Sequence, residues 1–172
     1  RWMKELMPLT ENKHLLAQKL EKEKTFPVTD ESFMISFKVH PQKNKTGKLA
    51  LSLLPADGYT NGCEFQLRLD EAVAQYGESR QESFSPKSLS QRNGSYVPGV
   101  GNYALENLVG IDKPFTVRMI VRSNAKLGGT IVDTEIAAQR TMISYRADLQ
   151  VKRLQLRADG AAISQVQMEK IK

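Results

Sequence analysis

The 172-residue sequence is poor in cysteine and histidine, the side chains from which disulfide frameworks and most zinc sites are built. Its single cysteine, Cys63, excludes an internal disulfide, and with only two histidines it leaves too little for a multi-cysteine zinc site. Glycine-rich phosphate-binding motifs and the Gly-x-Ser-x-Gly nucleophile elbow are also missing. We therefore expect neither a metal ion nor a cofactor. No apolar run approaches the ~20 residues of a spanning helix, so we expect no membrane span.

Aromatic residues are scarce at 7%, whereas basic residues outnumber acidic ones and give a net charge of +6. This balance permits binding to nucleic acid or another anionic partner. Nucleic-acid sites, however, need basic groups interleaved with aromatic side chains that stack on bases. Phe33, Phe37 and Phe65 are needed for the core, so we expect no nucleic-acid partner. A basic module that binds another anionic partner stays open as an alternative.

Apolar and polar residues alternate clearly over 32–40, 63–70 and 115–122. Period-two alternation is typical of a strand with one buried face. Gly128-Gly129 and Asp159-Gly160 are turn signals between such runs. Weaker alternation covers 47–54, 130–136, 141–146, 149–157 and 163–171. About eight short strands without intervening helices predict an all-β fold, an antiparallel β-sandwich.

Two segments depart from simple alternation. In 149–157 the phase slips at Lys152 and Arg153, where we expect a bulge. Residues 1–27 are rich in Lys, Glu and Leu, and Leu16 and Leu20 are spaced by four, as on a helix. Thr10 could cap a helix that starts at Glu11.

The predicted domain organisation is a linker or peripheral helix over 1–27 and a β-sandwich over 28–172. Because the sequence begins with Arg1 and carries no signal segment, we expect it to be a piece of a longer protein.

Asp133 and Glu135 are the carboxylates that could act as a catalytic acid and base. They alternate on one strand face, about 7 Å apart by strand geometry, and glycosidases use two carboxylates at similar separations. The same pair, with Arg140 and Arg146 nearby, also fits a solvated face with cross-strand ion pairs. Both interpretations stay open.

Sugar sites use exposed aromatics together with polar side chains, and tyrosine has both an apolar ring and a hydroxyl. A long loop is predicted over 83–104, which is rich in Ser and Gly. The alternative is that the tyrosines fix their loops to the sandwich. The candidate carbohydrate-binding residues are Tyr59 and Asn61 in one loop, and Tyr96, Asn102 and Tyr103 in the long loop.

The succession DESFMISFKV, KLALSLL, GCEFQLRLD, PFTVRMIVR and TIVDTEIAAQRTMISYR resembles the concanavalin A-like lectin and glucanase sandwich. It is most similar to the C-terminal sandwich of glycoside hydrolase family 32, the fructan hydrolases. The resemblance implies a jelly roll, with 1–27 as the linker from a catalytic propeller. Asp133 and Glu135 are two apart where the family spaces them by four, and Ala137-Ala138-Gln139 replaces an Asn-Asp-Gly turn. The propeller's catalytic motifs are absent, so no catalytic residue is carried over.

Together these observations predict a non-catalytic accessory β-sandwich of a secreted bacterial carbohydrate-active protein, extracellular or periplasmic. Its expected partners are the catalytic domain of the same polypeptide and fructan or another glycan. It would brace the catalytic domain or bind glycan weakly. The alternatives are a stand-alone glycan hydrolase that uses Asp133 and Glu135, and the basic interaction module.

Overall fold

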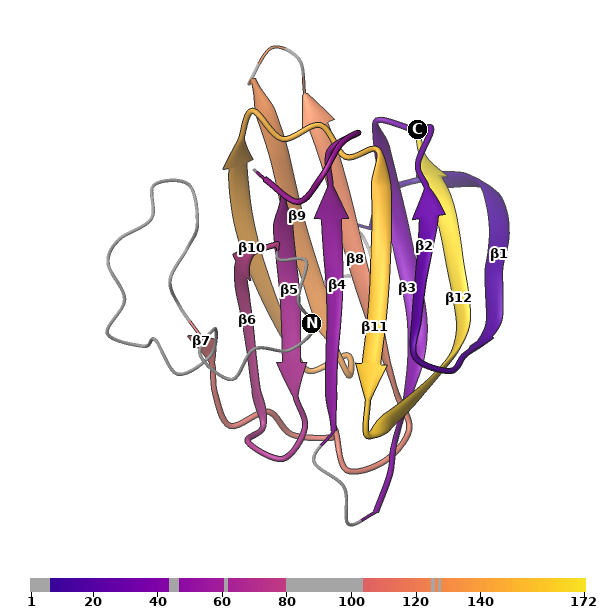
Figure 1. The fold of residues 1–172 in the computed structure, drawn as a ribbon, viewed down its shortest axis with the longest axis vertical. Coiled ribbons are helices and arrows are strands. Elements are labelled where there is room, and N and C mark those ends of the chain that lie inside the picture. The colour runs from indigo at the N-terminus through magenta and orange to yellow at the C-terminus, as the bar shows by residue number, and fades with distance from the viewer. Residues whose placement is uncertain (1–6, 44–46, 61, 80–103, 125, 127) are drawn as a thin grey trace.

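A computed structural model describes residues 7–43, 47–60, 62–79, 104–124, 126 and 128–172. Within these ranges the chain forms twelve strands and no helix. The strands build two six-stranded antiparallel sheets that lie one behind the other (Figure 1). The predicted antiparallel β-sandwich is confirmed.

We call the two layers sheet A and sheet B. Sheet A has the spatial order β1 (Thr10–Leu20), β12 (Ala161–Ile171), β3 (Ser32–Pro41), β8 (Phe115–Asn124), β9 (Gly129–Ile136) and β10 (Arg140–Ala147). Sheet B has the order β2 (Glu23–Pro27), β11 (Arg153–Asp159), β4 (Lys48–Leu54), β5 (Cys63–Arg68), β6 (Val73–Glu78) and β7 (Ala104–Leu105). In Figure 1 sheet B lies in front of sheet A.

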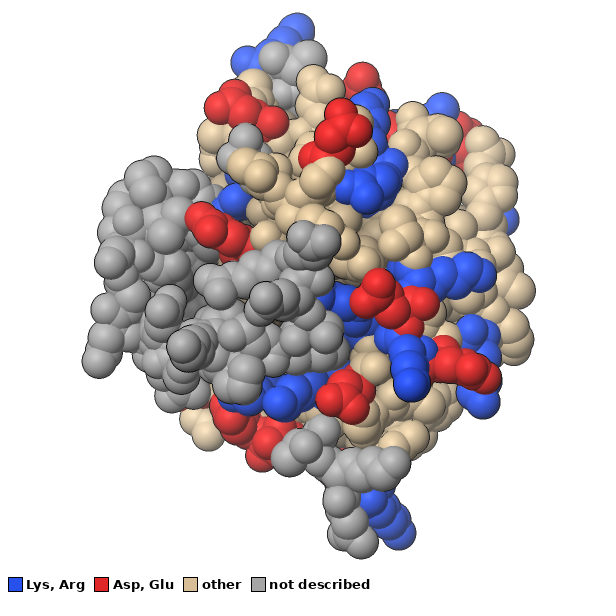
Figure 2. Space-filling model, viewed as in Figure 1, with Lys and Arg blue, Asp and Glu red and all other residues tan. Residues whose placement is uncertain are grey.

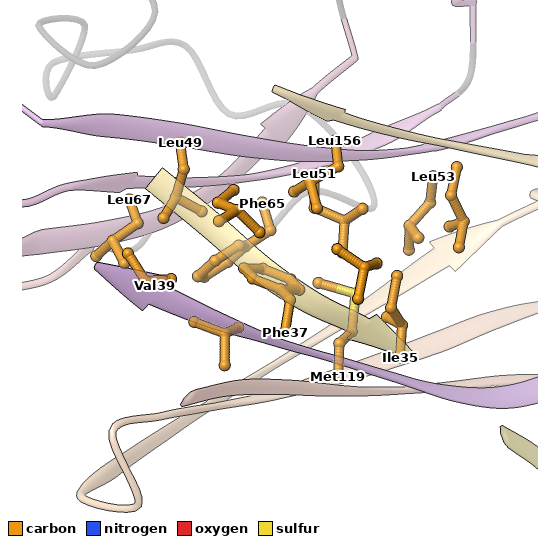
Figure 3. Close-up of a cluster of buried hydrophobic side chains, with 14 of the residues drawn as sticks. Ile35, Phe37, Val39, Leu49, Leu51, Leu53, Phe65, Leu67, Met119 and Leu156 are labelled. Carbon is orange, nitrogen blue, oxygen red and sulfur yellow. The ribbon is translucent and has the colours of Figure 1, made fainter. Parts of the chain in front are cut away.

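The core fills the space between the sheets with the apolar residues whose alternation predicted the strands. A fully buried Leu, Ile or Phe stabilises the fold by about 1.5–3 kcal/mol relative to an exposed one. Figure 3 shows side chains of sheet A, among them Ile35, Phe37, Val39 and Met119, packed against side chains of sheet B, among them Leu49, Leu51, Leu53, Phe65, Leu67 and Leu156. The residues between them on each strand point outward, away from the core.

The helix expected at the N-terminus is wrong, because residues 10–20 form β1 at the edge of sheet A. The register between β1 and β12 shifts twice, and Asn12 has a left-handed φ of 51°. Both shifts lie before Ala17 and break the period-two alternation there. β2 then joins sheet B. Residues 10–27 therefore supply an edge strand to each sheet.

The strand expected over 149–157 begins only at Arg153. Residues 149–152 are a connection in which Lys152 N–H donates to Leu54 O at 2.8 Å. The slip in alternation at Lys152 therefore marks the start of β11 rather than a bulge inside it. A register shift does occur in the next strand, between Ser164 and Gln167 of β12, where Gln165 has a φ of 52°.

Candidate functional site

Three adjacent strands of sheet B carry polar side chains on the face turned away from the core. Ser52 of β4 lies opposite Glu64 of β5 on one side and opposite Gln155 of β11 on the other. Residues directly opposite in antiparallel strands share a face. Leu51 and Leu53, which flank Ser52, lie in the core. The three polar residues therefore belong to the outer face.

A hydrogen-bonded ion pair holds this outer face together. Arg157 of β11 forms a salt bridge with Glu64 in which both side chains are only 2% exposed. Ser52 Oγ donates to the same carboxylate at 2.8 Å, and Gln66 Nε2 donates to its other oxygen. A buried charge is costly unless it is paired and hydrogen-bonded, and both conditions are met here. The network fixes the side chains of three strands relative to one another.

Arg153 fastens the loop between β4 and β5 onto the outer face of β11. Its Nε donates to Pro55 O at 3.2 Å, and its Nη2 donates to Gly58 O at 2.7 Å. On the other side of the loop, Ser79 Oγ donates to Tyr59 O at 2.5 Å. The loop that carries Tyr59 is therefore held by Arg153 of β11 on one side and by Ser79, which follows β6, on the other.

Gln155 lies beside this loop, two positions along β11 from Arg153. Its Nε2 donates to Glu23 Oε1 at 3.0 Å and to Tyr59 Oη at 3.4 Å. Gln155 is only 5% exposed, and its Oε1 has no hydrogen-bond partner among the residues that the structure describes. An unsatisfied buried acceptor costs about 1–3 kcal/mol. The amide is thus oriented by two partners, and its carbonyl oxygen is buried.

We call Glu23, Tyr59, Arg153 and Gln155 the Tyr59 cluster. It combines a half-buried aromatic ring, an exposed carboxylate, a guanidinium and an amide carbonyl. Figure 2 looks onto this face and shows basic and acidic side chains intermixed over its described part. Mixed donors and acceptors beside an aromatic ring suit a neutral ligand with many hydroxyl groups. The cluster contains no nucleophile next to a base, as covalent catalysis would require.

The sequence-predicted sugar residues are only partly placed by the structure. Tyr59 belongs to the cluster just described, where its hydroxyl also helps to fix the loop. The other four lie outside the described residues: Asn61, Tyr96, Asn102 and Tyr103.

The candidate carboxylates Asp133 and Glu135 lie on the outer face of sheet A, on β9. Glu135 is 1% exposed and forms an ion pair with Arg118 of β8, its cross-strand neighbour. Asp133 lies opposite Ile120 and Ile143. The arrangement gives Glu135 a structural partner and no free face toward solvent.

Arg146, which the sequence placed near these carboxylates, points elsewhere. Its Nη2 donates to Gly62 O of sheet B at 3.0 Å, and the side chain is buried. Arg140 of the same strand is exposed. The cross-strand ion pair of Glu135 is therefore made by Arg118 instead.

Cys63 is fully buried at the start of β5. Burial raises the pKa of its thiol from 9.0 to about 12, and the nearby Arg146 charge offsets only part of that rise. The thiolate is the nucleophilic form, so Cys63 acts as a small core residue.

The described part of the chain offers neither a cluster of metal ligands nor a membrane-spanning helix. No group of three or more His, Cys, Asp or Glu side chains there is arranged to hold a metal ion. None of the described segments forms a helix long and apolar enough to cross a membrane.

Gln155, Glu64 and Arg157 were missed by the sequence reasoning. Each lies between two apolar residues of a strand, and this pattern predicts no more than an outward-facing polar side chain. Arg157 and Glu64 are 93 residues apart in sequence, and only the order of strands in the sheet brings them together. The sequence did carry one signal for them. Several outward positions of β4, β5 and β11 hold serine, glutamine, glutamate or arginine, which can hydrogen-bond to one another, rather than lysine.

Neither a protein-family model nor a curated protein matches this sequence. Solved structures do share its architecture. Sheep galectin-11 in complex with glycerol aligns with a TM-score of 0.52 at 14% identity, over 85% of this chain and 95% of that one. The carbohydrate-binding module CBM66 from Bacillus subtilis aligns with a TM-score of 0.54 at 10% identity, over 94% of both chains.

A fructosyltransferase from A. japonicus aligns with a TM-score of 0.52 at 9% identity. The alignment covers 95% of this chain but only 26% of the fructosyltransferase. At such identities the likeness establishes the fold alone. The chain is a concanavalin-like jelly-roll β-sandwich, as expected, whereas the finer assignment to the C-terminal sandwich of family 32 remains a resemblance.

Proposed function

We propose that this chain is a non-catalytic glycan-binding β-sandwich that serves as an accessory domain of a larger carbohydrate-active protein. The observation that carries the proposal is the Tyr59 cluster, in which the half-buried Tyr59 and the exposed Glu23 carboxylate are both hydrogen-bonded to the Gln155 amide. A sugar face can pack against the Tyr59 ring while its hydroxyls donate to the exposed Glu23 carboxylate.

The similar folds support the proposal without establishing it. The aligned region makes up nearly the whole of the galectin-11 and CBM66 chains. In the fructosyltransferase it makes up about a quarter of the chain. An accessory sandwich attached to a catalytic domain of the same polypeptide is thus an arrangement that this fold supports. We extend the proposal to a secreted bacterial parent, extracellular or periplasmic, with fructan as the first ligand to test.

Isothermal titration calorimetry with levan and inulin oligosaccharides tests the binding, and a reducing-sugar assay on the same samples tests for hydrolysis. We expect saturable heat and no turnover. A folded protein that gives no heat would refute glycan binding in this panel. Turnover that is lost in the variant Asp133→Asn would instead favour the alternative hydrolase.

A pair of matched variants locates the site. Gln155→Leu removes the amide that orients Glu23 and Tyr59 and is expected to weaken binding about tenfold, the effect of losing roughly 1.4 kcal/mol. Gln167→Leu changes a half-buried glutamine on β12 of sheet A and is the control. Thermal unfolding establishes that both variants are folded. Equal affinities of the two variants would move the site away from the Tyr59 cluster.

A further inference from the structure

Three connections meet at one end of the sandwich and enclose a cavity of about 360 Å³. They are the segment before β3 at Glu31, the region between β8 and β9 at Gly128 and Gly129, and residues 148–152 between β10 and β11. The floor is formed by the glycine backbone at 128–129 and by the buried side chains of Leu149 and Val151. Ligand pockets usually occupy about 300–1,000 Å³, so this one accommodates a single small ring.

The charged groups around this cavity do not neutralise one another. Glu31, Asp148 and Lys152 all line it and are all exposed. Among the described residues, neither carboxylate forms a salt bridge and Lys152 forms none either. Two carboxylates and one ammonium are therefore presented around the same space, each available to a molecule that enters it.

The backbone around the cavity is already fixed by hydrogen bonds. Asp148 N–H donates to Gly128 O at 3.0 Å, which joins two of the three connections. Ser123 N–H donates to Glu31 O at 3.3 Å, and this bond ties the segment before β3 to the end of β8. Thr130 Oγ1 donates to Leu149 O at 2.6 Å beneath them. Because these bonds exist without a ligand, little ordering would be needed on binding.

We propose that this end cavity is a second ligand site, which takes one neutral sugar unit with adjacent free hydroxyl groups. A carboxylate accepts hydrogen bonds from two neighbouring hydroxyls, and Lys152 donates to a third oxygen. An anionic sugar meets two carboxylates against one ammonium and is disfavoured. The ligand class rests on the proposed glycan-binding function, whereas the site itself is separate from the Tyr59 cluster.

Two-dimensional ¹H–¹⁵N NMR of the full chain distinguishes the two sites, with D-fructose and D-galactose as neutral probes and D-glucuronate as the anionic one. We expect the neutral sugars to shift the amide signals of Gly128, Gly129 and Leu149. Glucuronate at the same concentrations is expected to leave them in place. Shifts of equal size with glucuronate would overturn the proposed ligand class.

Variants then separate this proposal from the function on which it rests. Asp148→Asn is expected to weaken binding at the cavity about tenfold, because a charge-assisted hydrogen bond is lost, while asparagine tolerates the left-handed φ of 58° at this position. Tyr59→Ala is expected to leave the cavity shifts unchanged. If sugars shift only the signals of the Tyr59 cluster, the second site is wrong and glycan binding stands. If no sugar shifts either set, both fail.

Discussion

Each sheet carries on its outer face a glutamate–arginine pair in which the glutamate is buried, and these two pairs differ in their access to water. In sheet B, Glu64 and Arg157 are both 2% exposed at the side chain. In sheet A, Glu135 is equally buried, but the side chain of Arg118 is 34% exposed. A buried cation that loses its carboxylate stays away from water, whereas a cation with access to solvent can be hydrated when its partner is lost. The same two residue types thus contribute differently to stability on the two sheets, and the pair on sheet B is expected to contribute more.

Removal of the glutamate charge on each face tests this contrast and has the largest expected effect. Glu64→Gln leaves Arg157 buried without its carboxylate and should lower the free energy of unfolding by about 3–5 kcal/mol. Glu135→Gln leaves Arg118 able to turn toward water and should cost less than about 1 kcal/mol. Urea denaturation of both variants measures the difference. Equal losses would contradict the comparison.

Tyr76 joins the two sheets through hydrogen bonds in the core, and so it tests a buried polar contact between the sheets rather than on an outer face. From β6 of sheet B its hydroxyl donates to Met142 O at 3.0 Å and lies 2.6 Å from Thr134 Oγ1, both in sheet A. Tyr76→Phe keeps the ring and leaves these buried partners unsatisfied, so we expect a loss of about 1–3 kcal/mol. Tyr145→Phe, on the outer face of sheet A, is the control and should change unfolding by less than about 0.5 kcal/mol. If Tyr76→Phe left the free energy of unfolding unchanged, the two sheets would be joined by apolar packing alone.

Cys63 begins β5, next to Glu64, and gives the inner side of sheet B a measurable pH dependence. Its folded pKa of about 12 exceeds the ordinary 9.0, so its contribution to stability is complete below pH 9 and is lost as pH rises toward 12. The slope from this one group is about 1.4 kcal/mol per pH unit. Unfolding of Cys63→Ala measured between pH 8 and pH 10.5 should show a shallower decline than the unmodified chain. Parallel declines would show that the thiol does not titrate differently on folding.

The hairpin turns give the smallest expected effect. β9 and β10 of sheet A are joined through Ala137 and Ala138, which both have a left-handed φ, of 52° and 51°. The connection from β11 to β12 places a glycine, Gly160, in the same region, at 70°. Alanine is strained there and glycine is not. Ala138→Gly should stabilise the chain by about 0.5–1 kcal/mol and Gly160→Ala should destabilise it by a similar amount; melting temperatures that move in the same direction would contradict this.

The sequence predicted those parts of the fold in which one residue type recurs with a clean period. β3, β5 and β8 alternate without interruption, and their apolar residues lie in the core as expected, although in β5 the outward Glu64 and Gln66 are buried as well. β1 was mistaken for a helix because Leu16 and Leu20 are spaced by four and the two register shifts leave no clean alternation before them. The strand β6 was missed, since VAQYGE has too few apolar residues for alternation to show.

The candidate site was predictable only where it lies in a loop. Tyr59 stood out as an aromatic residue in a turn-rich segment. Gln155 did not, because its environment comes from β2 and from the β4–β5 loop, which are distant in sequence. The end cavity was beyond sequence reasoning for the same reason, since three separate connections form its walls. Period and composition report on local burial, whereas strand order determines which side chains meet.

The most direct test of the proposed glycan site compares two tyrosines in a calorimetric titration with levan oligosaccharides. Tyr59 lies in the cluster on sheet B, and Tyr145, 43% exposed, lies on the outer face of sheet A. We predict that Tyr59→Ala weakens binding by about tenfold or more, as removal of a stacked aromatic does, and that Tyr145→Ala leaves the affinity within about twofold. Equal affinities of two folded variants, or a loss confined to Tyr145→Ala, would contradict the account.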